Sequence, residues 1–170
     1  MKIVIADTGP ILHLYQAGAL HLLASFEQVF VVPKVMEELG RHAPEVWRDG
    51  FPTWLHFAAP TVASSMRAAK WVEGEMLDPG EAESLAIAEE ISPDLFLTDD
   101  AAARLMAEGL GFVARGSLGV VLYCAAKGSL TQSDARAHLD ALFGNSTLWL
   151  SGTVKKRANA ALAQMFAPDL

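Results

Sequence analysis

The sequence predicts an α/β fold in which a parallel sheet carries helices on both faces. Short apolar runs rich in β-branched residues alternate along the chain with longer stretches of helical periodicity. Strands and helices that alternate in this way form parallel sheets covered on both sides. With 170 residues, 52% of them hydrophobic and 19% charged, the chain can bury a full core. It shows no repeat and no linker, so we expect one domain over residues 1–170.

The first strand is expected at residues 3–6, an apolar run of the kind found in strands buried on both faces. Asp7 follows it directly. Thr8, as N-cap, and Pro10, at a first helical position, then begin a helix. We expect this strand to be central, which places Asp7 where open α/β sheets have their active-site crevice. The plainer alternative is that Asp7 only caps the helix.

Prolines, glycines and capping residues mark the limits of the later elements. Pro33 opens a helix that Gly40 closes, and Asp78 precedes the start of another. Thr131 resembles the first residue of a capping box. Further strands are expected at residues 28–32, 55–58, 95–98 and 112–114. Further helices are expected at residues 19–24, 33–40, 61–72, 77–91, 101–109, 117–127, 131–143 and 151–166.

Composition argues against several classes of protein. A net charge of −7 is unlike that of proteins that coat nucleic acid, which are usually basic. It does not exclude an enzyme whose acidic residues surround a divalent cation. The single cysteine, Cys124, cannot form an internal disulfide, so we expect a cytoplasmic protein. The histidines lack the spacing of a zinc site, and no apolar run has the length of a membrane span.

Four separate segments offer carboxylates at the ends of predicted elements, and these are the candidate functional residues. Two of the segments end strands, and two lie at or near the starts of helices. They are Asp7, the Glu37–Glu38 pair, the Glu81–Glu83 pair and the Asp99–Asp100 pair. Hard cations such as Mg²⁺ and Mn²⁺ prefer oxygen ligands, so this pattern indicates a site for such a cation.

Helical periodicity distinguishes the members of two pairs. At about 100° per residue, Glu38 lies beside Val35 at the edge of an apolar arc, whereas Glu37 points to the opposite side. Glu81 lies on an apolar stripe of its helix, and Glu83 lies on a polar face. We therefore favour Glu38 and Glu81 as inward-facing residues. The alternative for both pairs is that acids in a first helical turn complement the helix macrodipole.

The third pair, Asp99 and Asp100, follows the strand at residues 95–98. One of the two can cap the next helix while the other faces the crevice. Asp100 also has Arg104 four residues on, which is the spacing of an ordinary helical ion pair. Two adjacent acids at a strand end are nevertheless more than one cap requires.

These motifs, taken in order, resemble the PIN-domain family, the nuclease fold of VapC-type toxins. The matching segments are DTGP, VPKVMEEL, GEAESLAIA, LFLTDDAAARLMAEGLG and RGSLGVVLYCAAKGSL, which together span nearly the whole chain. The GEAE and GSLG features suggest a branch of the family other than the best-studied toxins. The resemblance implies a three-layer α/β/α sandwich with a central, mostly parallel sheet of about five strands.

The resemblance also implies roles for the acidic residues. Carried over motif by motif, the catalytic residues would be Asp7, Glu38, Glu81 and Asp100, which would bind one or two Mg²⁺ or Mn²⁺ ions, with Asp99 as an accessory ligand. Glu81 is a departure, because VapC toxins usually have an aspartate at this position. Metal-activated water would make a histidine base unnecessary.

By the same resemblance, the protein would be an endoribonuclease that cleaves single-stranded or structured RNA, and the toxin of a type II toxin–antitoxin pair. Its partners would be RNA, a cognate antitoxin protein and a second copy of the chain, without a membrane. Candidate phosphate contacts are Arg104, Arg115, Lys34 and the amides of Gly116 and Ser117 at a helix start. Trp47, Trp54 and Trp71 are candidates for base stacking, although we expect at least two of them to be core or interface residues.

Other functions fit the residues less well. An interaction protein of the same fold that has lost catalysis remains open, because the chain has few basic residues for binding RNA. A phosphotransfer domain of similar layout would be another metal-dependent alternative. A haloacid-dehalogenase-like phosphatase needs Asp-x-Asp after the first strand, where this chain has Asp7, Thr8 and Gly9. A receiver domain needs an acidic pair there and a further aspartate after the third strand, which the sequence lacks. Apolar segments at residues 17–23 and 120–126 are candidates for either a dimer interface or the core.

Overall fold

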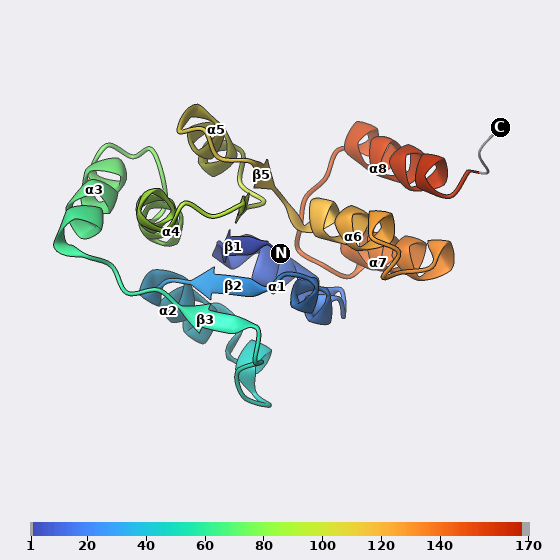
Figure 1. Cartoon of the computed structure of the whole chain (residues 1–170), viewed down its shortest axis with the longest axis horizontal. Helices are drawn as coiled ribbons and strands as arrows, with labels where there is room; N and C mark the ends of the chain where they lie inside the picture. Colours follow the sequence, from blue (N-terminus) through green and yellow to red (C-terminus); the bar gives the residue numbers. More distant parts are fainter. Residues whose placement is uncertain (1, 168–170) are drawn as a thin grey trace.

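A five-stranded sheet, parallel throughout, forms the centre of the computed structural model, which describes residues 2–167. Its strands are β1 (Ile3–Ala6), β2 (Gln28–Val31), β3 (Leu55–Phe57), β4 (Leu95–Leu97) and β5 (Ala114–Arg115). They lie in the order β3-β2-β1-β4-β5 (Figure 1), so the first strand is central, as predicted. Val4 of β1 pairs with Val29 of β2 on one side and Leu95 of β4 on the other.

Helices connect the strands. They are α1 (Thr8–Gln16), η1 (Leu20–Ser25), α2 (Pro33–His42), η2 (Pro44–Trp47), α3 (Val62–Glu73), α4 (Pro79–Ile91), α5 (Ala101–Gly109), α6 (Ser117–Ala126), α7 (Gln132–Gly144) and α8 (Gly152–Met165). The two labelled η are short 3-10 helices.

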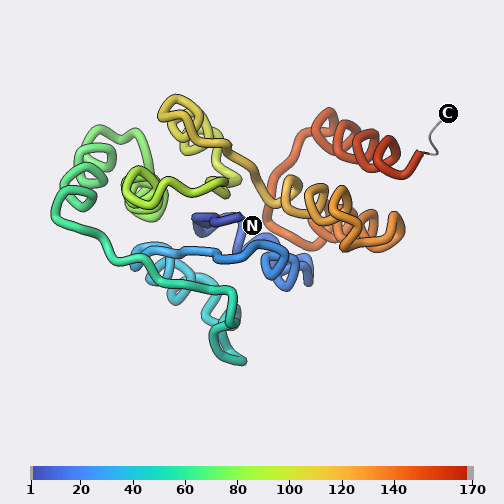
Figure 2. The backbone as a smooth tube through the Cα atoms, viewed as in Figure 1, coloured from blue at the N-terminus to red at the C-terminus, as the bar shows by residue number. Residues whose placement is uncertain are grey.

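The helices pack as two groups with the sheet between them, which confirms the three-layer α/β/α fold. Helix α4 contacts α3 and α5, helix α6 contacts α1, α7 and α8, and helix α2 contacts both α1 and α4. Figure 1 shows α3 and α4 on the left and α6, α7 and α8 on the right. The tube in Figure 2 shows β1 near the middle of the molecule and α8 at its outer edge.

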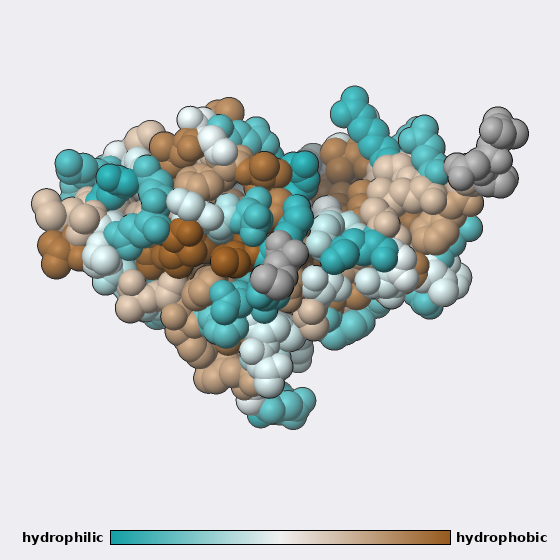
Figure 3. Space-filling model, in the orientation of Figure 1, coloured by the Kyte–Doolittle hydropathy of each residue, from teal (hydrophilic) through white to brown (hydrophobic). Residues whose placement is uncertain are grey.

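The core lies between the sheet and the helices. All three residues of β4 are buried, and Ile5, Phe96 and Leu97 have no exposed surface. From the helix layers, Leu85 of α4 and Leu139 of α7 are equally buried. On the face shown in Figure 3, the most hydrophobic residues gather in the left half, on the side of α3 and α4.

The apolar segments at residues 17–23 and 120–126 contribute to this core. Leu22 and Leu23 are buried, as are Val120 and Cys124 on α6. Their apolar character is therefore explained within one chain, and a homodimer stays a prediction. No helix among residues 2–167 combines the length and the hydropathy needed to cross a membrane.

Several element limits differ from the predicted ones for local reasons. Helix α1 begins at Thr8, and its N-cap is Asp7. Helix α2 passes through Gly40 and ends before Pro44, because the residue that precedes a proline avoids helical geometry. Strand β5 starts two residues later than predicted, since the Phe112 amide still donates to the Ala107 carbonyl in the turn that ends α5.

Candidate active site

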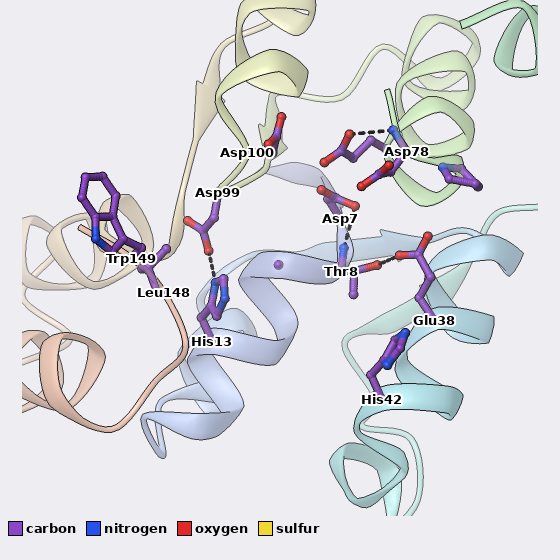
Figure 4. A pocket seen from close by; sticks show the side chains of 13 residues that line it. Asp7, Thr8, His13, Glu38, His42, Asp78, Asp99, Asp100, Leu148 and Trp149 are labelled. Atoms are coloured by element: carbon purple, nitrogen blue, oxygen red, sulfur yellow. Dashed lines mark hydrogen bonds and ion pairs between the residues drawn. The ribbon is translucent and has the colours of Figure 1, made fainter. Parts of the chain in front are cut away.

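An open pocket of about 540 Å³ lies at the carboxyl ends of β1 and β4. Figure 4 shows side chains from both sides of the sheet converging on it. Its walls are formed by Asp7, Thr8, Gly9, His13, Glu38, His42, Asp78, Pro79, Glu81, Asp99, Asp100, Leu148 and Trp149. The structure thus brings all four predicted catalytic acids together, with Asp99 and Asp78 beside them.

Asp7 is the most buried acid of the pocket, with 4% of its surface exposed. Its carboxylate accepts hydrogen bonds from the Thr8 amide at 2.7 Å and the Thr98 hydroxyl at 3.2 Å. Burial raises the pKa of Asp7 to about 8, with a further contribution from the negative charges of Glu81 and Glu38, against the lowering effect of the two hydrogen bonds. Asp7 is therefore both a helix cap and a pocket residue.

Glu38 points into the pocket from α2, and its neighbour Glu37 does not. The Glu38 carboxylate accepts hydrogen bonds from the Gly80 amide at 2.9 Å and from the Thr8 hydroxyl. Glu37 is exposed and pairs with Lys34 at 2.9 Å and with Arg41. This is the arrangement that the helical periodicity predicted.

Close approach of α4 to Glu38 depends on a glycine. A Cβ atom at Gly80 would lie 2.6 Å from both carboxylate oxygens of Glu38. Only a residue without a side chain lets the Gly80 amide reach this carboxylate. The sequence GEAE thus positions two acids, Glu81 directly and Glu38 through the space that Gly80 leaves.

Glu81 reaches the pocket from the first turn of α4. Its carboxylate accepts a hydrogen bond from the Asp78 amide at 3.0 Å and completes a capping box. Burial raises the pKa of Glu81 to about 7, and repulsion by Asp100, Asp78 and Glu38 adds to the rise. Glu83 lies outside the pocket and accepts a hydrogen bond from the Lys34 amide at 2.7 Å.

The adjacent acids after β4 have different partners. Asp100 caps α5 by accepting a hydrogen bond from the Ala103 amide at 2.8 Å, and it forms no ion pair with Arg104 within residues 2–167. Asp99 accepts hydrogen bonds from the Ser117 amide at 2.7 Å and the Ser117 hydroxyl at 2.5 Å, and it pairs with His13 Nδ1 at 2.7 Å. Asp99 thereby joins α1, β4 and α6, and its role as a metal ligand stays a prediction.

The predicted anion site at Gly116 and Ser117 is wrong for an external phosphate. Ser117 has no exposed surface, and its amide already binds the Asp99 carboxylate. The N-cap of α6 is Gly116, and a Cβ there would overlap Asp99 Oδ1. The anion at this helix start is therefore a side chain of the protein itself.

The remaining predicted substrate contacts fall into two groups. Arg104 donates to the Thr98 carbonyl at 3.2 Å, and Arg115 donates to the Ala114 carbonyl at 2.7 Å. Both arginines line a second cavity of about 380 Å³ beside the acidic pocket. Lys34 pairs with Glu37 instead. As expected for most of them, the tryptophans at positions 47, 54 and 71 pack against the core.

Sequence reasoning missed two prominent residues of the pocket. His13 lies on α1 and faces Asp99 (Figure 4), and the only signal for it was its position one helical turn after Gly9. Trp149 lies in the loop between α7 and α8, where no periodicity could have indicated a wall of the pocket.

The donor set suits a hard divalent cation, because it consists of carboxylate oxygens. Within residues 2–167, no three histidine, cysteine, aspartate or glutamate side chains are arranged to hold a metal ion as they stand. The carboxylates of Asp7, Glu38, Glu81 and Asp100 are instead bonded to neighbouring amides. A cation would need some of them to turn, and it would displace the protons that the raised pKa values of Asp7 and Glu81 retain.

Comparison with protein families identifies the family of the chain. The model of the family DUF3368, described as a PIN domain, matches residues 3–164. This match covers every strand of the sheet and all of the acidic residues in the pocket. A search of curated proteins finds none that matches the chain.

Proposed function

The chain belongs to the PIN-domain family, and we propose that it is a divalent-metal-dependent endoribonuclease. The family has a nuclease-type fold, which supports the hydrolysis of phosphodiesters. The choice of RNA, single-stranded or structured, rests on the resemblance to VapC-type proteins. The choice of Mg²⁺ or Mn²⁺ rests on the oxygen ligands of the pocket.

One observation carries this proposal: four acids from separate segments of the chain converge in one pocket. Asp7 comes from the end of β1, Glu38 from α2, Glu81 from α4 and Asp100 from the start of α5. Carboxylates crowded in this way repel one another and favour a bound cation. Stability alone gives no reason for such crowding, because each acid raises the cost of ionising the others.

The four carboxylates would hold the metal in this proposal, with Asp7 at the centre. A bound divalent cation supplies a nucleophilic water at neutral pH and neutralises charge on the phosphate in the transition state. Thr8 and Thr98 donate to Glu38 and Asp7, and so orient these two carboxylates. Gly80 keeps α4 close enough for Glu81 and Glu38 to face the same space.

The test is cleavage of a mixed pool of single-stranded RNA by the purified protein with Mn²⁺, with Mg²⁺ and with EDTA. We expect cleavage only with metal, and a loss of roughly 100-fold in the Asp7→Asn variant. Asp49→Asn is the matched control, since Asp49 is exposed and lies outside the pocket. A parallel pool of single-stranded DNA shows whether the enzyme selects RNA.

A non-catalytic interaction protein is the second candidate, because no three side chains of the described pocket are set to hold a metal. Calorimetry with Mn²⁺ separates the two functions. Metal binding that needs Asp7, together with RNA cleavage, supports the nuclease. If the protein neither binds Mn²⁺ nor cleaves RNA, the nuclease proposal is wrong.

The proposal extends to a toxin of a cytoplasmic toxin–antitoxin pair, held by a protein antitoxin and able to form homodimers. This part rests on the resemblance alone. Induced expression in a bacterial host should arrest growth, and Asp7→Asn should relieve the arrest. Growth that both proteins leave unaffected would count against a toxin role.

A further inference from the structure

Trp149 is the most exposed large hydrophobic residue among residues 2–167, with 84% of its surface open to solvent. Burying an aromatic side chain of this size would contribute roughly 2–3 kcal/mol to stability, so the fold gains little from leaving it open. Trp47, Trp54 and Trp71 all pack against the core. Trp149 is thus the one tryptophan of the described chain that is mostly open to solvent, while the other three are partly buried.

Trp149 lies where two cavities meet. It lines the acidic pocket of about 540 Å³ and also the neighbouring cavity of about 380 Å³. The two spaces share Asp99, Leu148 and Trp149 as walls. The two cavities, together called the groove, are therefore adjacent; Trp149 stands between them, and Figure 4 shows it at the edge of the acidic pocket.

Several hydrogen bonds hold the loop that carries Trp149. Gln16, at the end of α1, accepts from the Thr147 amide at 2.8 Å and from the Thr147 hydroxyl at 3.0 Å. The Ser146 hydroxyl donates to the Leu142 carbonyl at 2.6 Å and accepts from the Leu148 amide at 3.3 Å. These bonds hold residues 146–148, directly before Trp149, in place without a ligand, which lowers the entropy cost of binding.

Charge changes sign along this groove. The carboxylates lie on one side of Trp149, and the guanidinium groups of Arg104 and Arg115 lie along the other cavity. Arg115 is exposed, and one N–H group of its guanidinium donates a hydrogen bond to the Ala114 carbonyl. Cation-binding acids, a flat aromatic surface and an arginine in succession suit a phosphate, a base and a further phosphate.

We propose that Trp149 stacks on a base of single-stranded RNA next to the scissile phosphate, and that Arg115 contacts the phosphate beyond that base. This inference rests on the proposed nuclease function, and it names the surface by which that function selects unpaired RNA. Bases within a duplex are already stacked on both faces, so only an unpaired base can cover the indole.

Binding of labelled RNA octamers, measured by fluorescence anisotropy in an Asp7→Asn background with Mg²⁺, tests the proposal without cleavage. Trp149→Ala should weaken binding of an adenosine octamer about tenfold, and Trp149→Tyr should restore most of the affinity. Phe57→Ala is the matched control, because Phe57 is an exposed aromatic residue on β3 that lines neither cavity. It should bind as the parent does.

A fully abasic ribose-phosphate octamer distinguishes stacking from general contact. The parent should bind it about tenfold more weakly than the adenosine octamer, and Trp149→Ala should bind both equally. Arg115→Ala should weaken both octamers and reduce the slope of log affinity against log salt by about one. If Trp149→Ala binds the adenosine octamer as tightly as the parent, the inference is overturned, and a protein partner becomes the better ligand for the indole.

Cleavage with the native pocket separates this inference from the function on which it rests. Trp149→Ala should raise the KM for RNA, whereas Phe57→Ala, at a residue outside both cavities, should leave it unchanged. RNA cleavage that is equally efficient with and without Trp149 refutes the stacking surface and leaves the nuclease intact. Octamer binding through Trp149 by a protein that cleaves nothing would refute the nuclease and keep the surface.

Discussion

At the scale of single residues, Glu37 and Glu38 show how neighbouring acids of one helix can differ completely. Glu38 faces Gly80 and Thr8 inside the pocket, whereas Glu37 is neutralised outside it by Lys34 and Arg41. The two basic partners hold the pKa of Glu37 below its usual range. Only Glu38 is placed to contribute charge to a bound cation.

We expect Glu38→Gln to reduce metal-dependent RNA cleavage by roughly 100-fold and to weaken Mn²⁺ binding, because an amide is a poorer ligand than a carboxylate. Glu37→Gln is the matched control on the same helix and should retain cleavage within about twofold, since it loses only exposed ion pairs. Initial rates at saturating Mn²⁺ and calorimetric titrations check both expectations. Equal losses in the two variants would refute the assignment of Glu38.

The residues that sequence reasoning identified share one property, namely a position that the local pattern determines. Asp7 ends a strand, and Glu38 and Glu81 lie on helices whose apolar arcs could be read from the sequence. Trp149 has no such pattern, because loop side chains follow contacts with distant parts of the chain. The contact that positions its loop comes from Gln16, 131 residues away from Thr147.

At the scale of elements, Asp99 forms a junction between strand β4 and the two helices α1 and α6. It connects the end of β4 to Ser117 at the start of α6 and to His13 on α1. The sequence predicted these elements and their order, yet it assigned the helix start at Ser117 to a phosphate. The carboxylate of Asp99, 18 residues before Ser117, accepts the hydrogen bond from the Ser117 amide instead. The pairing of β4 with β5 brings the two residues together.

Replacing Gly116 by alanine should weaken this junction. The new Cβ would overlap Asp99 Oδ1 and approach the Thr98 carbonyl oxygen to 3.2 Å, so we expect a loss of about 1–3 kcal/mol in the free energy of unfolding. The backbone of Gly116 is extended, so alanine adds no conformational strain of its own. Urea denaturation followed by circular dichroism measures the change.

Gly144→Ala serves as the control for this substitution. Gly144 lies at the end of α7 with no heavy atom within 4 Å of an added Cβ, so alanine there should be neutral or stabilise the protein by up to about 1 kcal/mol. If Gly116→Ala were equally well tolerated, Asp99 would have room to move, and its hydrogen bonds to Ser117 would not fix the junction.

At the scale of the whole molecule, a chain with a net charge of −7 gathers six of its carboxyl groups around one pocket. The central strand delivers the most buried of them, because β1 has neighbours on both sides and helices on both faces. The sequence predicted the parallel sheet, the central strand and the four acidic segments, and the family match confirms the fold. The bonds that each carboxylate makes could not be predicted, since they depend on backbone amides of other elements, such as that of Gly80.

Burial of these acids, and secondarily their mutual repulsion, makes the stability of the metal-free protein depend on pH. The pKa of Asp7 is about 8 in the folded protein, against 3.8 for an unperturbed aspartate, and that of Glu81 is about 7 against 4.5. At a pH between the unperturbed and the raised pKa of each acid, the folded state holds more protons than the unfolded state. Below about pH 4 both acids are protonated in the folded and in the unfolded protein, so they do not reduce the free energy of unfolding. As the pH rises to about 8, the buried carboxyl groups must ionise or stay protonated at a cost, and the folded protein loses stability.

We expect Asp7→Asn, measured without metal, to become progressively more stable than the native protein as the pH rises from 5 to 8. At pH 8 the difference in the free energy of unfolding should reach at least about 2 kcal/mol, because asparagine cannot ionise in the buried position. Urea denaturation in EDTA at several pH values measures it. Excess Mn²⁺ should reduce or reverse the difference by stabilising the native protein alone. If the difference in the free energy of unfolding between the two proteins stays constant from pH 5 to pH 8, Asp7 ionises as freely in the folded protein as in the unfolded chain.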